Sequence, residues 1–402
     1  MSNYNPGDVF VDYFILNSPR GVLDLTTIFL NAEIYESIYN PGIVGHFTIV
    51  DTEDYIGNLK FSGDETVEFS FLPPGGSTTT YKLNLNSVED ITTKGSMKTK
   101  VYTLVCLSKE PFEARTNIVT KSWNTQISNM VGDVFKNFLN SGKNITVEAT
   151  KGLQRYISPS IKPFKLLKEL RKRAVSLENK SSNFVFFENA SGFNFVTIEG
   201  LMKKDVVKRL KQVDTVGSSI PQTLDNNIIS YQLKKQASAL DRISTGSMNI
   251  QINTFDIRTK KYTSDIKKAK ESDFGIMGSM TSDFFRNMFG SKPARNIFVN
   301  KDSMDPNTFL NLALADKAAH LGSLTQNALE VEVPGDTVYQ AGKCVWADIP
   351  KKVSTTGMSS TEELISGKFL ITRMAHIIKK PQVRPRYVNS LELIKMGFEN
   401  GV

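Results

Sequence analysis

Histidine and cysteine are scarce in this chain, with 3 His and 2 Cys among 402 residues. Cys106 and Cys344 are too far apart in sequence to suggest a small disulfide framework, and we interpret both as reduced residues half-buried in strands. So few thiols and imidazoles cannot form a zinc cluster of the usual spacing. A site made only of carboxylates is not excluded, but no pattern indicates one. We therefore expect no metal and no cofactor, and we interpret His46, His320 and His376 as structural residues.

Long apolar runs are also absent. No segment approaches the roughly 18–20 apolar residues of a membrane-spanning helix, which excludes a helical membrane protein. The first residues carry neither a basic flank nor an apolar stretch, so we expect no secretory signal and no membrane insertion.

The usual catalytic motifs are missing too. There is no nucleophile elbow, phosphate-binding loop or Cys-x-x-Cys pair, and Gly275–Gly278 follows no predicted strand. Acidic pairs such as Asp64/Glu65, Glu89/Asp90 and Glu362/Glu363 are adjacent in sequence. Neighbouring side chains on a strand point to opposite faces, so we do not expect these pairs to act as a joint acid and base. The sequence predicts no catalytic residues and gives no reason to expect an enzyme.

Charge is distributed unevenly along the chain. The formal net charge is +8, yet residues 1–110 hold 14 Asp/Glu and only 7 Lys/Arg. The remainder is therefore basic, with Lys/Arg clusters near residues 203–211 and 258–270. A nucleic-acid-binding body is one interpretation, and solvated surface or an acidic protein partner is the one we favour, because no recognition helix or stacking aromatics accompany the clusters.

Residues 1–110 are rich in short β-favouring runs separated by turns such as Asn40-Pro41-Gly42 and Pro73–Gly76. Strands at this spacing predict a small antiparallel barrel, and no helix is expected in it. Residues 111–205 change to an α+β pattern. Apolar residues at helical spacing predict helices over 127–138 and 163–177, and Phe184–Phe187 and Phe193–Val196 predict a hairpin.

The second half of the chain returns to strands. We expect a linker at 206–222, a second barrel built from 223–243 and 325–398, and an inserted mixed domain at 244–324 containing a helix that starts near Asp305 and Pro306. The predicted fold class is α+β and mainly β, with two similar antiparallel barrels and α+β domains inserted between and within them.

An internal repeat supports the two-barrel prediction. A strand between Gly63 and Pro73 precedes two further strands, Leu83–Ile91 and Tyr102–Cys106. In the same order, Gly342–Pro350 precedes Phe369–Ile377 and Tyr387–Leu391. The middle strands match at Leu85 with Ile371, Val88 with Met374 and Ile91 with Ile377.

Turn residues at fixed places in this repeat are the candidate site. Each one by itself is an ordinary turn or strand-end residue, and the order along the chain is what is informative. The candidates are Pro41, Gly42, Gly45, Asp51, Gly63, Glu65, Pro334, Gly335, Asp336 and Gly342.

This ordered set of segments resembles the central baseplate hub protein of contractile-tailed bacteriophages, a family that includes the hub portion of type VI secretion spikes. The segments that carry the resemblance are 39–51 and 61–67, then 163–167, 173–174, 184–187 and 192–195, and finally 329–336, 341–342 and 367–376. Residues 244–322 match least.

The resemblance implies a homotrimer whose six barrels form a pseudo-six-fold ring in the virion, at the tail baseplate. Its expected partners are a hexameric tail-tube or tube-initiator protein, a trimeric central spike, and genomic DNA that passes through a channel without sequence-specific binding. Assembly in the host cytoplasm is implied as well. Two alternatives stay open: a spike-associated cell-wall hydrolase and a DNA-binding virion protein.

Overall fold

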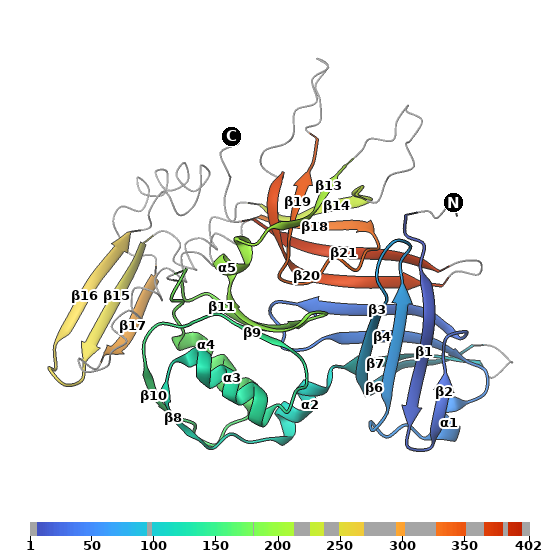
Figure 1. Ribbon diagram of the computed structural model, residues 1–402, viewed down its shortest axis with the longest axis horizontal. Coiled ribbons are helices and arrows are strands. Elements are labelled where there is room, and N and C mark those ends of the chain that lie inside the picture. Colours follow the sequence, from blue (N-terminus) through green and yellow to red (C-terminus); the bar gives the residue numbers. More distant parts are fainter. Residues whose placement is uncertain are drawn as a thin grey trace, which may run out of the picture.

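The computed structural model describes residues 6–94, 99–179, 181–212, 226–236, 249–268, 295–301, 327–350, 366–380 and 385–395. Antiparallel sheets dominate these residues, and most of the helices lie in the middle of the chain (Figure 1). The predicted class, α+β and mainly β, is confirmed. None of the helices in the described ranges has the length and apolar character of a membrane span.

The N-terminal strands form one antiparallel unit, the first sheet module. Its sheet order is β3-β4-β7-β6-β5-β1-β2, and Phe14, Phe47 and Phe69 pack together in its core, tilted or edge-to-face, with ring centroids 4.9–5.4 Å apart. One short helix interrupts the strands, although no helix was expected in this module. The Asp54 carboxylate caps its start by accepting a hydrogen bond from the Gly57 N–H at 3.3 Å. The elements are β1 (Phe10–Ser18), β2 (Gly21–Asp24), β3 (Phe29–Ser37), β4 (Val44–Asp51), α1 (Tyr55–Leu59), β5 (Thr66–Leu72), β6 (Thr79–Lys94) and β7 (Thr99–Leu107).

The α+β domain follows, with two amphipathic helices packed on a hairpin and sharing one buried apolar cluster with it. The predicted hairpin is present, but the second helix ends at Arg173, before Leu177. Ala174 is already extended, and the Leu177 side chain is 57% exposed. The elements are α2 (Lys109–Thr116), β8 (Ser122–Thr125), α3 (Ile127–Phe138), β9 (Ile145–Val147), β10 (Gln154–Ile157), α4 (Pro163–Arg173), β11 (Phe184–Asn189), β12 (Gly192–Thr197) and α5 (Ile198–Met202).

The C-terminal strands form the second sheet module, ordered β14-β18-β21-β20-β19-β13. Val206–Lys211, expected in a linker, is strand β13: it pairs in parallel with β19, and Leu210 is fully buried in the module core. A bridge between Lys211 and Asn227 connects β13 to the residues that lead into β14. The elements are β13 (Val206–Lys211), β14 (Ser230–Gln236), β18 (Asn327–Pro334), β19 (Cys344–Asp348), β20 (Gly367–Lys379) and β21 (Arg386–Ile394).

A three-stranded sheet occupies the described part of the insertion between β14 and β18. Its order is β16-β15-β17, and its strands are β15 (Asn249–Asp256), β16 (Tyr262–Lys268) and β17 (Arg295–Lys301). The helix predicted from Asp305 lies outside the described residues.

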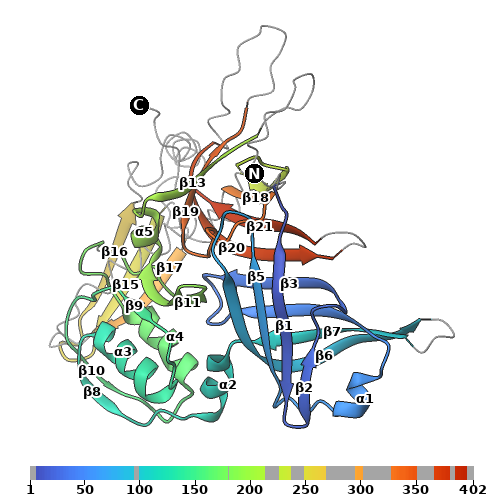
Figure 2. The ribbon, with the colours of Figure 1, turned by 45° about the vertical axis from the view of Figure 1, so that its right-hand side comes forward.

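The two modules share one sheet. The second half of β20 pairs antiparallel with β3, from Arg373 opposite Ser37 to Lys379 opposite Asn31. Eight strands therefore follow one another without a break, in the order β14-β18-β21-β20-β3-β4-β7-β6, and we call this run the shared wall. In Figure 2 the β6–β7 and β20–β21 hairpins project from it on the same side.

The strand pairings support the internal repeat. β3, β4, β5, β6 and β7 have the sheet order 3-4-7-6-5, and β14, β18, β19, β20 and β21 have the corresponding order. A β-bulge falls at Asn86 in β6 and at Thr372 in β20, which are matched positions in the predicted alignment. The third strand is shifted by two residues from the alignment of Tyr102 with Tyr387, because the register places Leu104 with Leu391 instead.

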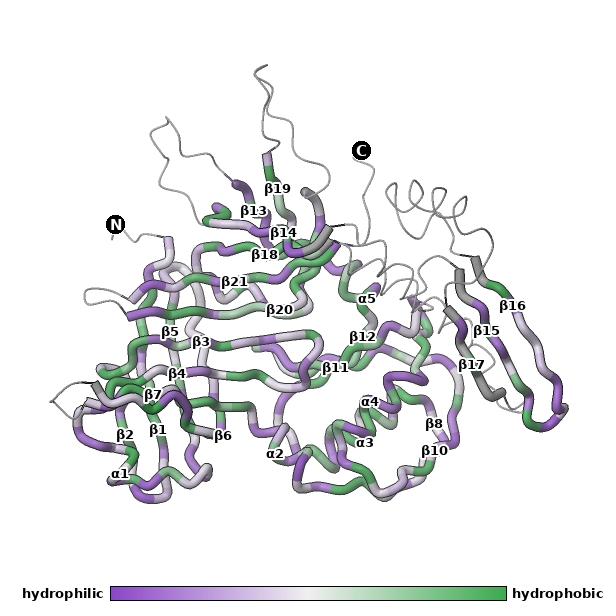
Figure 3. Tube along the Cα trace, turned by 180° about the vertical axis from the view of Figure 1, so that it is seen from behind, coloured by the Kyte–Doolittle hydropathy of each residue, from purple (hydrophilic) through white to green (hydrophobic). Residues whose placement is uncertain are grey.

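The shared wall has one face against the module cores and one face turned away from them. Along β18, Leu329, Val331 and Val333 are buried, whereas Glu330 and Glu332 point to the other side. Figure 3 looks onto this second face, where polar and apolar positions alternate along the strands.

Candidate functional site: the junction of the modules

The first group of candidate residues shapes the chain around β4. The Cβ of an alanine at Gly42 would lie 2.8 Å from the Pro111 side chain, so the glycine allows the turn to pack against α2. Gly45 lies within β4, where an added Cβ would meet Leu83 at 2.6 Å. Pro41 lies directly before Gly42 in the turn. These residues position strands and expose no reactive group.

Two buried carboxylates hold the loop that connects β4 to β5. Asp51 accepts hydrogen bonds from the backbone N–H of Glu53 at 3.0 Å and Tyr55 at 2.8 Å. Glu65 accepts from the N–H of Ser62 at 3.0 Å and Gly63 at 2.8 Å. Both side chains are fully buried, and both satisfy backbone donors of the loop beside them.

The second group holds the turn after β18. The Gly335 N–H donates to the Tyr387 carbonyl at 3.0 Å, and the Tyr387 ring lies where a Cβ on Gly335 would project. Asp336 forms an ion pair with Lys208 of β13 at 2.6 Å, and its N–H donates to the side-chain oxygen of Asn389 at 2.6 Å. The turn thus connects β13, β18 and β21, and Pro334 is the last residue of β18.

Gly342 brings the second module against the α+β domain. Its φ angle is +85°, a left-handed conformation, and an added Cβ would lie 2.6 Å from the Phe187 ring. Its N–H donates to the Ile371 carbonyl of β20 at 2.9 Å. The candidate residues therefore do not converge on one pocket. They fix the turns at which strands and domains meet.

Glu36, which the sequence reasoning missed, lies where three parts of the chain meet. Its side chain is 1% exposed and accepts hydrogen bonds from the backbone N–H groups of Ala190 at 2.8 Å and Ala341 at 3.0 Å. Burial raises the pKa of Glu36 from its ordinary 4.5 to about 7, although both N–H donors act to lower it. The signal in the sequence was alternation, since Ala32, Ile34 and Glu36 share one face of β3.

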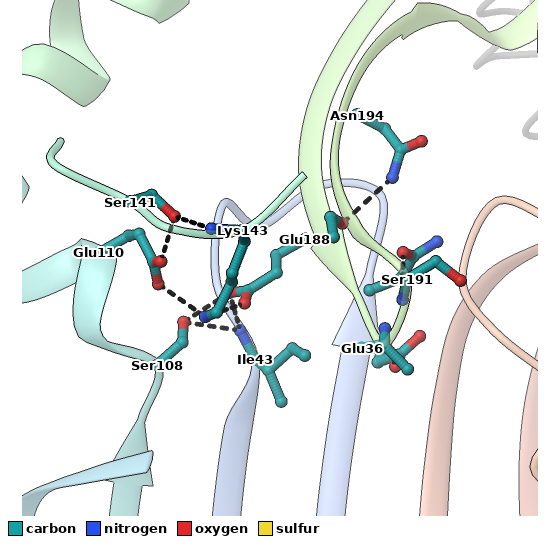
Figure 4. A network of polar contacts seen from close by, with 12 residues as sticks. Glu36, Ile43, Ser108, Glu110, Ser141, Lys143, Glu188, Ser191 and Asn194 are labelled. Carbon is teal, nitrogen blue, oxygen red and sulfur yellow. Dashed lines mark hydrogen bonds and ion pairs between the residues drawn. The ribbon is translucent and has the colours of Figure 1, made fainter. Parts of the chain in front are cut away.

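A second buried network joins the α+β domain to the first module (Figure 4). Lys143 reaches Glu110 at 2.8 Å and Glu188 at 2.5 Å, and both carboxylates are almost completely buried. Glu188 also accepts hydrogen bonds from the Ser108 hydroxyl at 2.6 Å and the Ile43 N–H at 3.2 Å. Burial works to lower the pKa of Lys143, but the two glutamates outweigh burial and raise it, so the lysine is held as a cation.

His376 belongs to a third polar cluster, on the side of the shared wall that faces the module cores. Its ring is 1% exposed, and Nδ1 lies 2.5 Å from the Tyr387 hydroxyl and 3.0 Å from the Asn389 side-chain nitrogen. Burial lowers the pKa of His376 to about 3, so the ring is neutral at pH 7. This agrees with the structural role expected for it.

A cleft of about 360 Å³ opens between β6 and the β11–β12 turn. Its lining includes Tyr81, Lys82, Lys143, Glu188 and Ser191. In the described part of the chain, no group of His, Cys, Asp and Glu is arranged to hold a metal ion. Three polar side chains of the lining, Ser108, Lys143 and Glu188, are bonded in one network, and its physical effect is to fix the domains in place.

The chain was compared with known proteins by sequence and by fold. No family model matches the chain. The chain is 21% identical over 388 residues to gp334 of Vibrio phage KVP40, described as a probable baseplate hub protein, with 90% of this chain and 88% of gp334 covered.

Two solved structures share the fold over almost the whole chain. A tail protein from Neisseria meningitidis MC58 has a TM-score of 0.59 at 10% identity, covering 96% of this chain and 97% of its own. The 43 kDa tail protein of prophage MuSo2 from Shewanella oneidensis has a TM-score of 0.57 at 10% identity, covering 95% and 98%. The resemblance to phage baseplate hub and tail proteins is confirmed.

Proposed function

We propose that three copies of this chain form the hub of a phage tail baseplate, a ring of six similar sheet modules. The ring joins a hexameric tail tube on one side to a trimeric central spike on the other, and it leaves a channel through which genomic DNA passes. It works as an adaptor in the virion, with no catalytic step.

The observation that carries this proposal is the pairing of β3 with β20. It places two modules with the same strand order edge to edge in one sheet. A chain with two such modules presents two similar surfaces, so a closed three-fold assembly presents six. The partners on the two sides can then have different symmetries.

The assignment to a baseplate rests on the similarity to gp334, which extends over most of both chains. The shared fold with two tail proteins supports the same assignment, although fold by itself does not establish function. No part of the proposal depends on a short motif.

We propose that the second face of the shared wall lines the channel. Five glutamates lie at its strand positions: Glu33, Glu89, Glu330, Glu332 and Glu392. Basic residues lie on the same face, and two of them form ion pairs with these glutamates: Lys234 with Glu330 at 2.8 Å and Arg373 with Glu392 at 3.2 Å. Carboxylates on this face repel the DNA backbone and weaken the binding of passing DNA.

The native mass of the purified chain tests the proposal. Native mass spectrometry is expected to give three times the chain mass, and averaged electron-microscope images are expected to show a ring with six similar lobes. A chain that remains monomeric at every concentration, or a ring without six-fold-like features, contradicts the proposal.

A further inference from the structure

We infer that the ring closes by strand pairing: the outer edge of β6, from Ser87 to Thr93, pairs antiparallel with β14 of a second copy of this chain. This inference rests on the proposed trimer and names the surface that builds it.

Both edges are open in the described part of the chain. β6 pairs with β5 only as far as Asn84, and beyond the bulge at Asn86 it pairs with β7 alone. β14 pairs along its length with β18 alone. These two edges are the ends of the shared wall. An exposed isoleucine lies at each end: Ile91 in β6 is 54% exposed, and Ile229, just before β14, is 55% exposed. Open edges of this kind are templates for another strand.

The chain already contains the equivalent joint. In the repeat, β20 corresponds to β6 and β3 corresponds to β14. β20 pairs with β19 up to its bulge, and beyond the bulge the same edge pairs with β3. The corresponding half of β6 has no strand paired on this edge in the described part of the chain. The strand that corresponds to β3 is β14, and β14 of another copy can pair there.

The internal joint predicts the register of the external one. Ile377 lies opposite Glu33, and Val388 lies on the other side of Ile377. In the first module, Val101 is the residue that corresponds to Val388, and Val101 lies opposite Thr92 of β6. Thr92 follows a second bulge in β6, which contains Asp90 at φ +53°. Along β14, Gln232 takes the place of Glu33, because Glu330 and His46 are matched partners in β18 and β4. Thr92 is therefore expected opposite Gln232.

Backbone directions agree with this register. The Val50 N–H donates to Ile28, away from β7, so the backbone of Val101, opposite Val50, is turned toward β6. Val101 then bonds with Thr92, and the next residue, Thr93, turns its N–H and C=O outward. The corresponding N–H groups in β20 point toward β3, as the Lys380 N–H does when it donates to Leu30 at 2.9 Å.

Head-to-tail pairing of the two wall ends closes into a ring because each new joint repeats the geometry of the internal one. Two kinds of joint then alternate around the ring, and three copies complete it. A heterologous contact that failed to close would give an open filament instead.

Disulfide trapping tests the pairing. Thr92 and Gln232 are both exposed and are predicted to form a non-hydrogen-bonded pair, whose Cα separation suits a disulfide. The chain's own cysteines, Cys106 and Cys344, are buried and do not interfere. Mild oxidation of Thr92→Cys/Gln232→Cys is expected to give a band at three times the chain mass on a non-reducing gel. Each single variant is expected to run at the mass of one chain.

The matched control is Thr93→Cys/Gln232→Cys, which moves one thiol to the opposite face of the wall and is expected to remain uncrosslinked. A native trimer without the covalent band overturns the strand pairing and leaves the proposed hub intact. Equal crosslinking of the control overturns the register. A native mass of one chain overturns the trimer and the pairing together.

A second variant tests the same edge without a thiol. Thr93→Pro removes one outward N–H while the bond between Thr92 and Val101 remains, and it is expected to raise the concentration needed for the trimer at least tenfold. An unchanged far-UV circular dichroism spectrum shows that the chain still folds. Undiminished assembly of a folded Thr93→Pro variant contradicts the inference.

Discussion

The Glu36 carboxylate of the first sheet module accepts a hydrogen bond from the Ala341 N–H of the second, at 3.0 Å and 305 residues further along the chain. The other carboxylate oxygen accepts from Ala190 of the α+β domain. One buried side chain therefore connects three parts of the molecule, and its protonation affects how they are held together.

Stability is expected to depend on pH through Glu36. Its pKa is raised to about 7 in the folded chain, so the folded protein holds a proton that the unfolded chain has lost between pH 4.5 and 7. The free energy of unfolding then falls as pH rises through this window, by up to about 3 kcal/mol. In thermal denaturation, Glu36→Gln is expected to reduce the loss of stability between pH 4.5 and 7. Glu33→Gln, on the other face of the strand, is expected to leave that loss unchanged. An unaltered slope in Glu36→Gln contradicts this account.

Lys143→Met is expected to destabilise the chain strongly. It leaves Glu110 and Glu188 buried without their shared cation, which costs roughly 2–4 kcal/mol after allowing for the partial exposure of the lysine. Lys82→Met is the control, because Lys82 pairs with Glu68 at the surface and its loss costs less than about 1 kcal/mol. Urea unfolding of both variants measures the difference, and equal effects would show that the buried network contributes little.

Gly342→Ala and Gly63→Ala form a matched pair. Both glycines have a left-handed φ, so alanine costs about 1 kcal/mol or more of strain at each. At Gly342 the new methyl group also meets the Phe187 ring, for a further 1–3 kcal/mol or so, whereas no atom lies within 4 Å of it at Gly63. We expect the Gly342 variant to unfold at clearly lower urea, and similar midpoints would show that Phe187 moves aside freely.

The glutamates on the second face of the shared wall are expected to limit the retention of DNA. Glu33→Lys combined with Glu332→Lys should make the assembled ring bind duplex DNA, with an affinity that falls steeply as salt increases. Filter binding at low and moderate salt measures this. Glu53→Lys, an exposed site near α1, is the control and should bind no more than the original chain. Equal binding by the control places the channel elsewhere.

Much of the fold was predictable because local patterns determine it. The strands of the first module, the helix at Ile127–Phe138 and the hairpin around Ala190 and Ser191 follow from periodicity and turn chemistry. β13 was missed because its lysines, followed by glycine and serine, looked like a basic linker. Its partner, β19, lies more than 130 residues away in sequence, and no local signal announces such a pairing.

The candidate residues were identified in part. The glycines and prolines at the turns could be found because backbone geometry restricts what can stand there. Glu36 and Lys143 could not, since their importance comes from partners brought together only by the folded chain. A charged residue on the inward face of a strand was the one available signal, and it applies to Glu36 alone.

The pairing of β3 with β20 also has a consequence for assembly kinetics. In the proposed ring, three of the six joints lie inside single polypeptides, where tethering fixes a high effective concentration whatever the dilution. Only the other three joints respond to how many copies a cell has made. Nucleation therefore requires three molecules to meet, where a ring built from separate modules would require six.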